Sequence, residues 1–153
     1  MKKIYSFVLL YFFITGCSKD FLDSYDNRVE GTWSLTDVDR RGLGGSISHL
    51  PFTDGQFVFS DGGALIYASS TGTTYRGSWD ISHRRVSGGC SIDENGNQDC
   101  TDRHVRALHI TAVDFTTQDV KTEYFDEIVF TGTNKFKAFI YDGAHTYVFH
   151  FKR

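Results

Sequence analysis

The sequence predicts an all-β fold, an eight- to nine-stranded antiparallel up-and-down barrel. Short segments in which apolar and polar residues alternate are separated by glycine-rich turns, and the 153 residues include 15 glycines but one proline. Such alternation indicates strands with one buried face, and tight turns make consecutive strands antiparallel neighbours. Because a meander leaves two unpaired edges unless it closes, we expect a barrel, with an open sandwich of the same strands as the alternative.

In the N-terminal half, aromatic residues at alternate positions define the strands. Trp33 lies on the first strand, and Phe57 and Phe59 share one face of the second. The clearest period of two puts Tyr75 and Trp79 on one face of the fourth strand, with polar residues between them. The expected strands are Thr32–Val38, Gln56–Ser60, Ala64–Ser69, Thr74–Ser82 and Arg85–Ile92.

The C-terminal half continues the same pattern. In the last strand Tyr147, Phe149 and Phe151 share a face, and Val148 and His150 lie on the opposite one. The expected strands are Asp102–Val113, Thr122–Thr131, Lys135–Tyr141 and Ala144–Lys152.

Most connections between these strands are turns of a few residues. Asp61–Gly63, Ser70–Gly72, Gly132–Asn134 and Asp142-Gly143 have compositions typical of tight turns. The exception is the long connection Asp39–Gly55, which follows the first strand. We expect it to lie over an open end of the barrel.

The first residues of the chain carry a secretory signal. Lys2 and Lys3 precede the apolar run Ile4–Ile14, which is shorter than the roughly 20 residues that span a membrane. Small residues and then Cys17 follow. The segment therefore resembles a bacterial lipoprotein signal, which implies cleavage before Cys17 and lipid on that cysteine.

This resemblance sets the domain boundaries and the location. Residues 1–16 are expected to be the signal peptide, residues 17–30 the lipidated cysteine with a flexible tether, and residues 31–153 the barrel domain. The protein is then lipid-anchored in the bacterial cell envelope, and Ser18 after the cysteine favours the outer membrane, on its periplasmic or its surface face. Loss of the two leader lysines changes the net charge from −3 to −5. A mildly acidic chain without a basic cluster argues against a nucleic-acid partner.

The cysteine count agrees with this location. Once Cys17 is lipidated, Cys90 and Cys100 remain as a pair, and an oxidising envelope favours a disulfide between them. Asn95-Gly96 between them is a strong hairpin signal, so the bond would staple two antiparallel strands. The alternative, two free thiols that bind a metal, lacks further ligands at suitable spacing.

Gly31-Thr32-Trp33, at the start of the first strand, resembles the opening motif of lipocalins and related barrels. The long first connection and the segment Phe57–Asp80 support the similarity to the lipocalin-like domains of small bacterial lipoproteins. Barrels of this group often carry a late basic residue that packs across the first-strand tryptophan. Arg153 has the strand parity to cover Trp33 in this way, with a solvated terminal arginine as the alternative.

The resemblance implies binding of a small, mostly apolar ligand in the barrel, with no enzymatic activity. An eight-stranded barrel can be filled by its own side chains or can hold one small ligand. The alternative is therefore a solid barrel, an interaction or scaffold lipoprotein that binds a protein or a glycan through its loops. Tyr75 would orient a ligand through its phenol. The ligand-binding candidates are Trp33, Phe57, Phe59, Tyr75, Trp79, Tyr147 and Phe149.

Nothing in the sequence indicates catalytic residues, a cofactor or a metal site. Motifs for nucleophilic serine, zinc hydrolysis and phosphate-binding loops are absent. His104 and His109 are five residues apart, as are His145 and His150, which places each pair on opposite faces of a strand. The one metal arrangement worth testing is His109 meeting His145 or His150 across the barrel.

Overall fold

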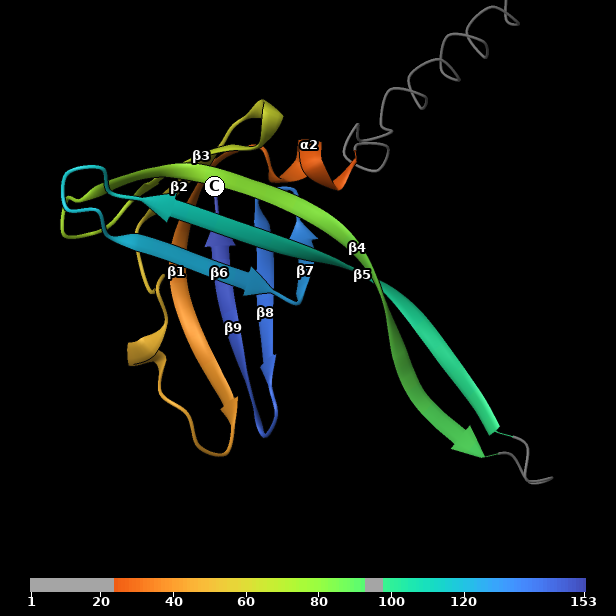
Figure 1. Cartoon of the computed structure of the whole chain (residues 1–153). Helices are drawn as coiled ribbons and strands as arrows, with labels where there is room; N and C mark the ends of the chain where they lie inside the picture. Colours follow the sequence, from red (N-terminus) through yellow and green to blue (C-terminus); the bar gives the residue numbers. More distant parts are fainter. Residues whose placement is uncertain (1–23, 93–97) are drawn as a thin grey trace, which may run out of the picture.

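The computed structural model describes residues 24–92 and 98–153, and for residues 87–92 and 98–101 it describes the backbone alone. The fold is a curled nine-stranded antiparallel sheet (Figure 1), in which the hydrogen-bonded order is β6-β5-β4-β3-β2-β1-β9-β8-β7. The all-β prediction is confirmed, and consecutive strands pair antiparallel with the exception of β6 and β7. The strands are β1 (Gly31–Gly42), β2 (Gln56–Phe59), β3 (Ala64–Ala68), β4 (Thr74–Ile92), β5 (Gln98–Val113), β6 (Val120–Phe125), β7 (Glu127–Gly132), β8 (Lys135–Asp142) and β9 (His145–Lys152).

Two strand predictions are wrong in a way that changes the architecture. Thr74–Ser82 and Arg85–Ile92 form the single strand β4, and Thr122–Thr131 is divided into β6 and β7 by Asp126. The long connection after β1 contains a short 3₁₀ turn, η2 (Ile47–His49), and a second turn, η3 (Asp61–Gly63), joins β2 to β3.

The predicted closure of the barrel is also wrong, because β6 and β7 are the two edges of the sheet and do not pair with each other. At Phe125 the chain still pairs with Leu108 of β5. One residue later the N–H of Asp126 donates to the Phe139 carbonyl of β8, 2.8 Å away. The chain thus moves from one half of the sheet to the other by changing its hydrogen-bond partner.

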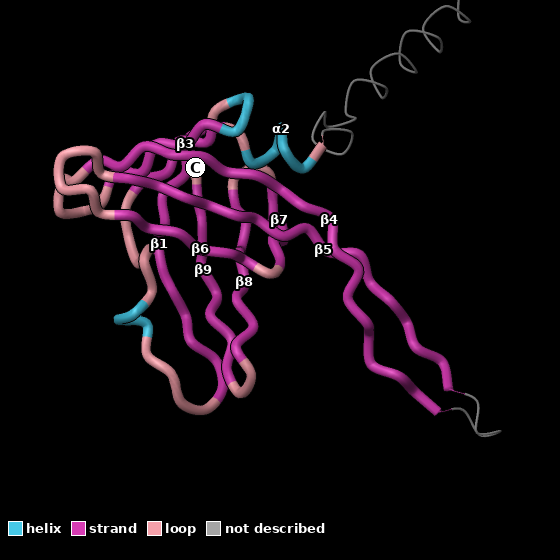
Figure 2. Tube along the Cα trace, in the orientation of Figure 1, coloured by secondary structure: helices cyan, strands magenta, loops and turns pink. Residues whose placement is uncertain are grey.

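The N-terminal boundary of the folded part lies before residue 31. Residues expected in the flexible tether form the short helix α2 (Tyr25–Val29), drawn in cyan in Figure 2, and Val29 is fully buried. Ser24 caps this helix by accepting a hydrogen bond from the Asn27 N–H at 3.4 Å. The entry of the chain is therefore fixed to the body of the domain.

The strands β4 and β5 continue far beyond the rest of the sheet (Figure 1). Pairing with β3 ends at Ser78, and pairing with β6 begins at Leu108. Between these points, in the described residues, the backbones of β4 and β5 form ladder hydrogen bonds only with each other. We call the projecting part, residues 85–92 and 98–104, the arm.

Candidate functional site

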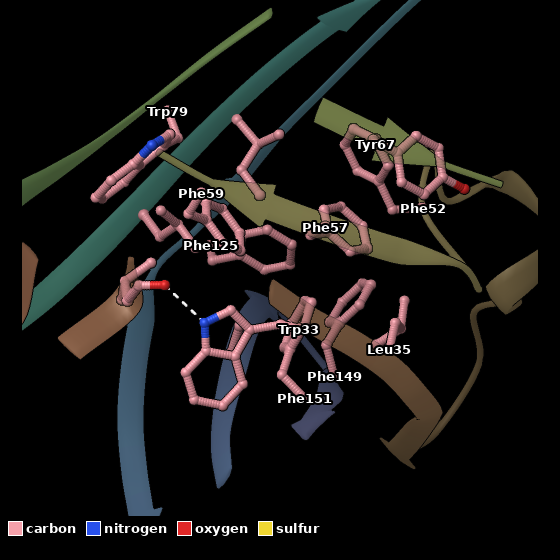
Figure 3. Packing of buried hydrophobic residues seen from close by; sticks show 14 of the residues in the cluster. Trp33, Leu35, Phe52, Phe57, Phe59, Tyr67, Trp79, Phe125, Phe149 and Phe151 are labelled. Carbon is pink, nitrogen blue, oxygen red and sulfur yellow. Dashed lines mark hydrogen bonds between the residues drawn. The ribbon is translucent and has the colours of Figure 1, made fainter. Parts of the chain in front are cut away.

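The seven residues predicted to line a ligand cavity lie together in the core, but they pack against one another and against further rings. Trp33, Phe57 and Phe149 are fully buried, and the other four are at most 7% exposed. Ring centroids lie 5.5 Å apart for Phe59 and Trp79 and 4.7 Å apart for Trp33 and Phe136. Figure 3 shows five of these side chains, Trp33, Phe57, Phe59, Trp79 and Phe149, among the packed rings of the core.

Sequence reasoning missed several rings that complete this packing. Phe52 comes from the long β1–β2 connection and lies 5.0 Å from the ring of Tyr67. Phe125 lies 4.9 Å from Phe149, and Phe136 stacks on Phe151 at 4.4 Å. The connection expected to cover an open end thus contributes an aromatic plug to the core.

The polar atoms of the predicted ligand-binding rings are bonded within the protein. Trp33 Nε1 donates to the Val29 carbonyl at 2.6 Å, and Trp79 Nε1 donates to the Ser60 carbonyl at 3.1 Å. The phenol of Tyr75, expected to orient a ligand, donates instead to Asp119 at 2.9 Å. Burial and this hydrogen bond raise the pKa of Tyr75. Tyr147 likewise donates to the Ser46 carbonyl at 3.2 Å, so these four polar groups are occupied.

The three histidines predicted as possible metal ligands each lie beside a different acidic residue. His109 lies 3.4 Å from Asp80 and 3.3 Å from Thr122, whereas His150 pairs with Asp39 at 3.0 Å. His145 lies 3.1 Å from Asp142, the last residue of β8. In the part of the chain that the structure describes, no group of three or more histidine, cysteine or acidic residues could hold a metal ion.

The arm, by contrast, projects beyond the packed interior (Figure 1). Two-stranded ribbons are marginally stable by themselves, so something must hold this one. At its base Arg103 forms a two-pronged ion pair with Glu127, with N–O distances of 3.2 and 2.8 Å, and Tyr141 donates to the same carboxylate at 2.6 Å. The hydrogen bond with Tyr141 and the charge of Glu127 raise the pKa of Arg103.

A second ion pair fixes the other strand of the ribbon. Arg84 lies 3.2 Å from Asp126, the residue at which the chain turns from β6 into β7. Arg84 also lies over the ring of Tyr124, 5.6 Å from its centroid. Both strands of the ribbon are therefore tied to the β6–β7 corner, which gives the arm a defined direction. The sequence signal for this site was the basic composition of residues 83–85 and 103–106 on two paired strands.

Towards its tip, the arm carries the cysteine pair. Cys90 and Cys100 are directly opposite each other in the backbone register of β4 and β5, which resumes there after a shift that follows Ser87. Their side chains lie outside the described residues, so the disulfide stays a prediction. A covalent bond at this register would hold the two strands together where no third strand supports them.

The fold and the site together define a β-sheet protein with an aromatic-filled interior and a projecting two-stranded arm. Comparisons with protein-family models, with curated proteins and with solved structures found no match. The lipocalin resemblance therefore rests on the residues of this chain alone. No helix among the described residues is long and apolar enough to cross a membrane. Cys17 and the predicted signal peptide lie outside the described residues.

Proposed function

We propose that this chain is a lipid-anchored, non-enzymatic interaction protein of the bacterial cell envelope, whose arm binds a partner protein. The observation that carries the proposal is the arm itself, a directed two-stranded ribbon that extends beyond the sheet and whose described residues pair with no third strand. Free ribbon edges can pair with an extended segment of another chain, and the charged flanks of this arm would prevent unspecific pairing.

The packed interior supports the interaction function over the expected small apolar ligand. A ligand cavity must be lined by side chains that leave space between them. Here the rings of the core contact each other at centroid distances of 4.4 to 6.5 Å, and the polar atoms of the candidate rings are bonded within the protein. The interior then serves as a rigid base from which the arm projects.

The anchor and the family remain parts of the proposal. Cys17 supplies the lipid, and Gly31-Thr32-Trp33 with Arg153 supports a relationship to lipocalin-like lipoproteins. The guanidinium carbon of Arg153 lies 4.3 Å from the centroid of the Trp33 ring, which confirms the contact predicted from strand parity. Mass spectrometry of the envelope-extracted protein tests the anchor, since a Cys17→Ser variant should lose the acyl chains and leave the membrane fraction.

Photo-crosslinking in cells tests the arm. A photoreactive residue is placed at Arg85 or His104 on the arm, and at Arg76 on the outer face of the body as the matched control. The proposal predicts adducts with one protein from the arm positions and none from Arg76. A variant in which residues 87–102 are replaced by Asn-Gly, so that the paired residues Val86 and Arg103 flank the turn, should keep its thermal unfolding transition and lose the adduct. Equal adducts from arm and body positions would contradict the proposal.

A further inference from the structure

The outer face of β8 and β9 carries an unusual arrangement of positive charge. Lys135 is directly opposite Lys152, and Lys137 is directly opposite His150 in the antiparallel register. The side chains surround a surface hollow of about 490 Å³. Its polar lining residues are Thr36, Thr131, Lys135, Lys137, His150 and Lys152.

The three lysines are not neutralised by the protein. Within the described residues, none of them forms an ion pair with a carboxylate. The acidic residues of the neighbouring strand are Asp37, which lies opposite His150, and Asp39, which pairs with it at 3.0 Å. Like charges placed directly opposite each other destabilise a sheet. An anion in the hollow would remove this repulsion.

The hollow lies at the end of the sheet where the chain enters. Lys152 is next to Arg153, whose guanidinium donates to the Arg28 carbonyl of α2 at 2.9 Å and also to that of Glu30. Figure 1 shows α2 and the C-terminus at this same end. Ser24 lies seven positions after Cys17, and an extended segment of that length spans at most about 25 Å. A lipid on Cys17 would therefore keep this end close to the membrane.

A second hollow beside α2 has the opposite charge. Its volume is about 400 Å³, and four carboxylates line it, those of Asp26, Glu30, Asp61 and Asp80. An anionic membrane attracts the lysine hollow and repels this acidic one. Asp26 and Glu30 belong to α2 and its C-cap, so both hollows lie at the end where the chain enters, and their opposite charges decide which side of that end faces the lipid.

We infer that the hollow formed by Lys135, Lys137 and Lys152 binds the phosphate group of an anionic lipid headgroup and so orients the domain on the membrane. The inference rests on the proposed lipid anchor for the source of the phosphate. The chemistry it requires is a phosphate-bearing group that accepts hydrogen bonds from two or three ammonium groups. The bound headgroup would hold one side of the entry end against the lipid, and this would fix the direction of the arm.

The test uses the full chain in non-ionic detergent micelles. Lysine side chains are labelled by reductive methylation, which keeps their charge, and their NMR signals are followed while phosphatidylglycerol, phosphatidylcholine or pyrophosphate is added. Phosphatidylglycerol is expected to shift the signals of the three lysines, and phosphatidylcholine is not. Pyrophosphate should compete with the anionic lipid.

Matched double variants distinguish binding at the lysine hollow from general attraction between a positively charged protein surface and an anionic lipid. Lys135→Gln with Lys152→Gln should weaken binding of phosphatidylglycerol about thirtyfold, since each lysine near an anionic surface contributes roughly a factor of five. Arg41→Gln with Arg76→Gln removes the same charge from exposed arginines elsewhere and should leave binding within about twofold of the unmodified protein.

Each other result overturns the inference. Equal weakening by both double variants would mean unspecific attraction, and binding of pyrophosphate without phosphatidylglycerol would mean that the hollow takes a soluble phosphate compound. No shift with any of the three would mean that the hollow binds no phosphate. The micelle experiment needs neither the anchor nor the partner protein, so a failure there is distinct from a failure of the Cys17→Ser fractionation or of the arm crosslinks.

Discussion

At Trp33 three segments of the chain meet. The indole nitrogen donates to the Val29 carbonyl of α2, and the ring lies between Phe136 of β8 and the guanidinium of Arg153. The same guanidinium donates to carbonyl groups at the end of α2. Arg153 therefore closes this end of the core by joining the last strand to the first helix.

Replacing Arg153 tests this closing contact. Arg153→Gln should lower the free energy of unfolding by about 1–3 kcal/mol, because it removes the cation–π contact and the hydrogen bonds to α2. Arg153→Lys keeps the charge and should recover part of the loss. Chemical denaturation measures both variants. A loss below about 0.5 kcal/mol for Arg153→Gln, a size typical of surface substitutions, would show that the arginine is solvated.

Gly77 is a second position where one residue decides the packing. A Cβ atom at Gly77 would overlap the Thr111 carbonyl oxygen of β5. Gly77→Ala should therefore destabilise the protein by about 1–3 kcal/mol, as measured by thermal unfolding. Gly132→Ala is the matched control, since a Cβ there meets no atom within 4 Å. Similar unfolding temperatures for the two variants would contradict this close approach of β4 to β5.

The lipocalin resemblance and the parity of the last strand together indicated the Arg153 contact, with a solvated arginine as the alternative, whereas the environment of Gly77 was not visible in the sequence. Parity fixes which face a side chain takes, and Phe151 and Arg153 share that face. The distance between neighbouring backbones depends on the local twist of the sheet. A glycine in an alternating strand therefore indicates a close approach without showing which partner requires it.

At the scale of elements, the alternation of apolar and polar residues predicted most strands correctly. It failed where no buried face of a strand requires that alternation. His83–Arg85 interrupts the alternation, yet β4 continues through these residues because the ribbon is largely solvent-exposed there. At Asp126 the opposite happens, since the sequence pattern continues while the hydrogen-bond partner changes from β5 to β8. The arm and the unclosed edge both arise at these two points.

The predicted disulfide is a property of the arm. If Cys90 and Cys100 are bonded, then Cys90→Ser with Cys100→Ser should speed amide hydrogen exchange in the arm and leave that of the body nearly unchanged. A bond that closes so short a loop contributes roughly 2–3 kcal/mol, and the ribbon has no third strand to compensate for its loss. Non-reducing mass spectrometry of envelope-extracted protein checks the bond directly. Alkylation of both thiols without prior reduction would rule it out.

At the scale of the whole molecule, the sequence predicted which rings face inward but not whether a cavity remains between them. Trp33, Phe57 and Phe149 were predicted to face inward, and they do. Whether they leave a cavity depends on rings from elsewhere in the chain, chiefly Phe52, which is fully buried although it lies in a long connection. A loop residue has no strand parity, so its contribution could not be predicted.

The dense interior also predicts how the stability changes with pH. Burial raises the pKa of Tyr67 from 10.0 to about 12. Because the folded-state pKa is above the unfolded one, this tyrosine's contribution is complete below pH 10 and is lost as the pH rises from 10 to about 12. The unfolding temperature should therefore fall less steeply over this pH range in Tyr67→Phe than in the unmodified protein. The part of the unfolding free energy that Tyr67 loses over this range is at most about 2.7 kcal/mol. Parallel curves for the two proteins would show that Tyr67 ionises normally.

The central claim is that the interior is filled and that the binding function lies outside it. The most direct measurement is a titration of the purified protein with fatty acids, retinoids and bile acids, followed by the fluorescence of Trp33 and Trp79 and by thermal unfolding. A filled core predicts no saturable change in fluorescence and no increase in the unfolding temperature with any of these compounds. A saturable response that also raises the unfolding temperature would contradict the account, because it would require a ligand among the packed rings.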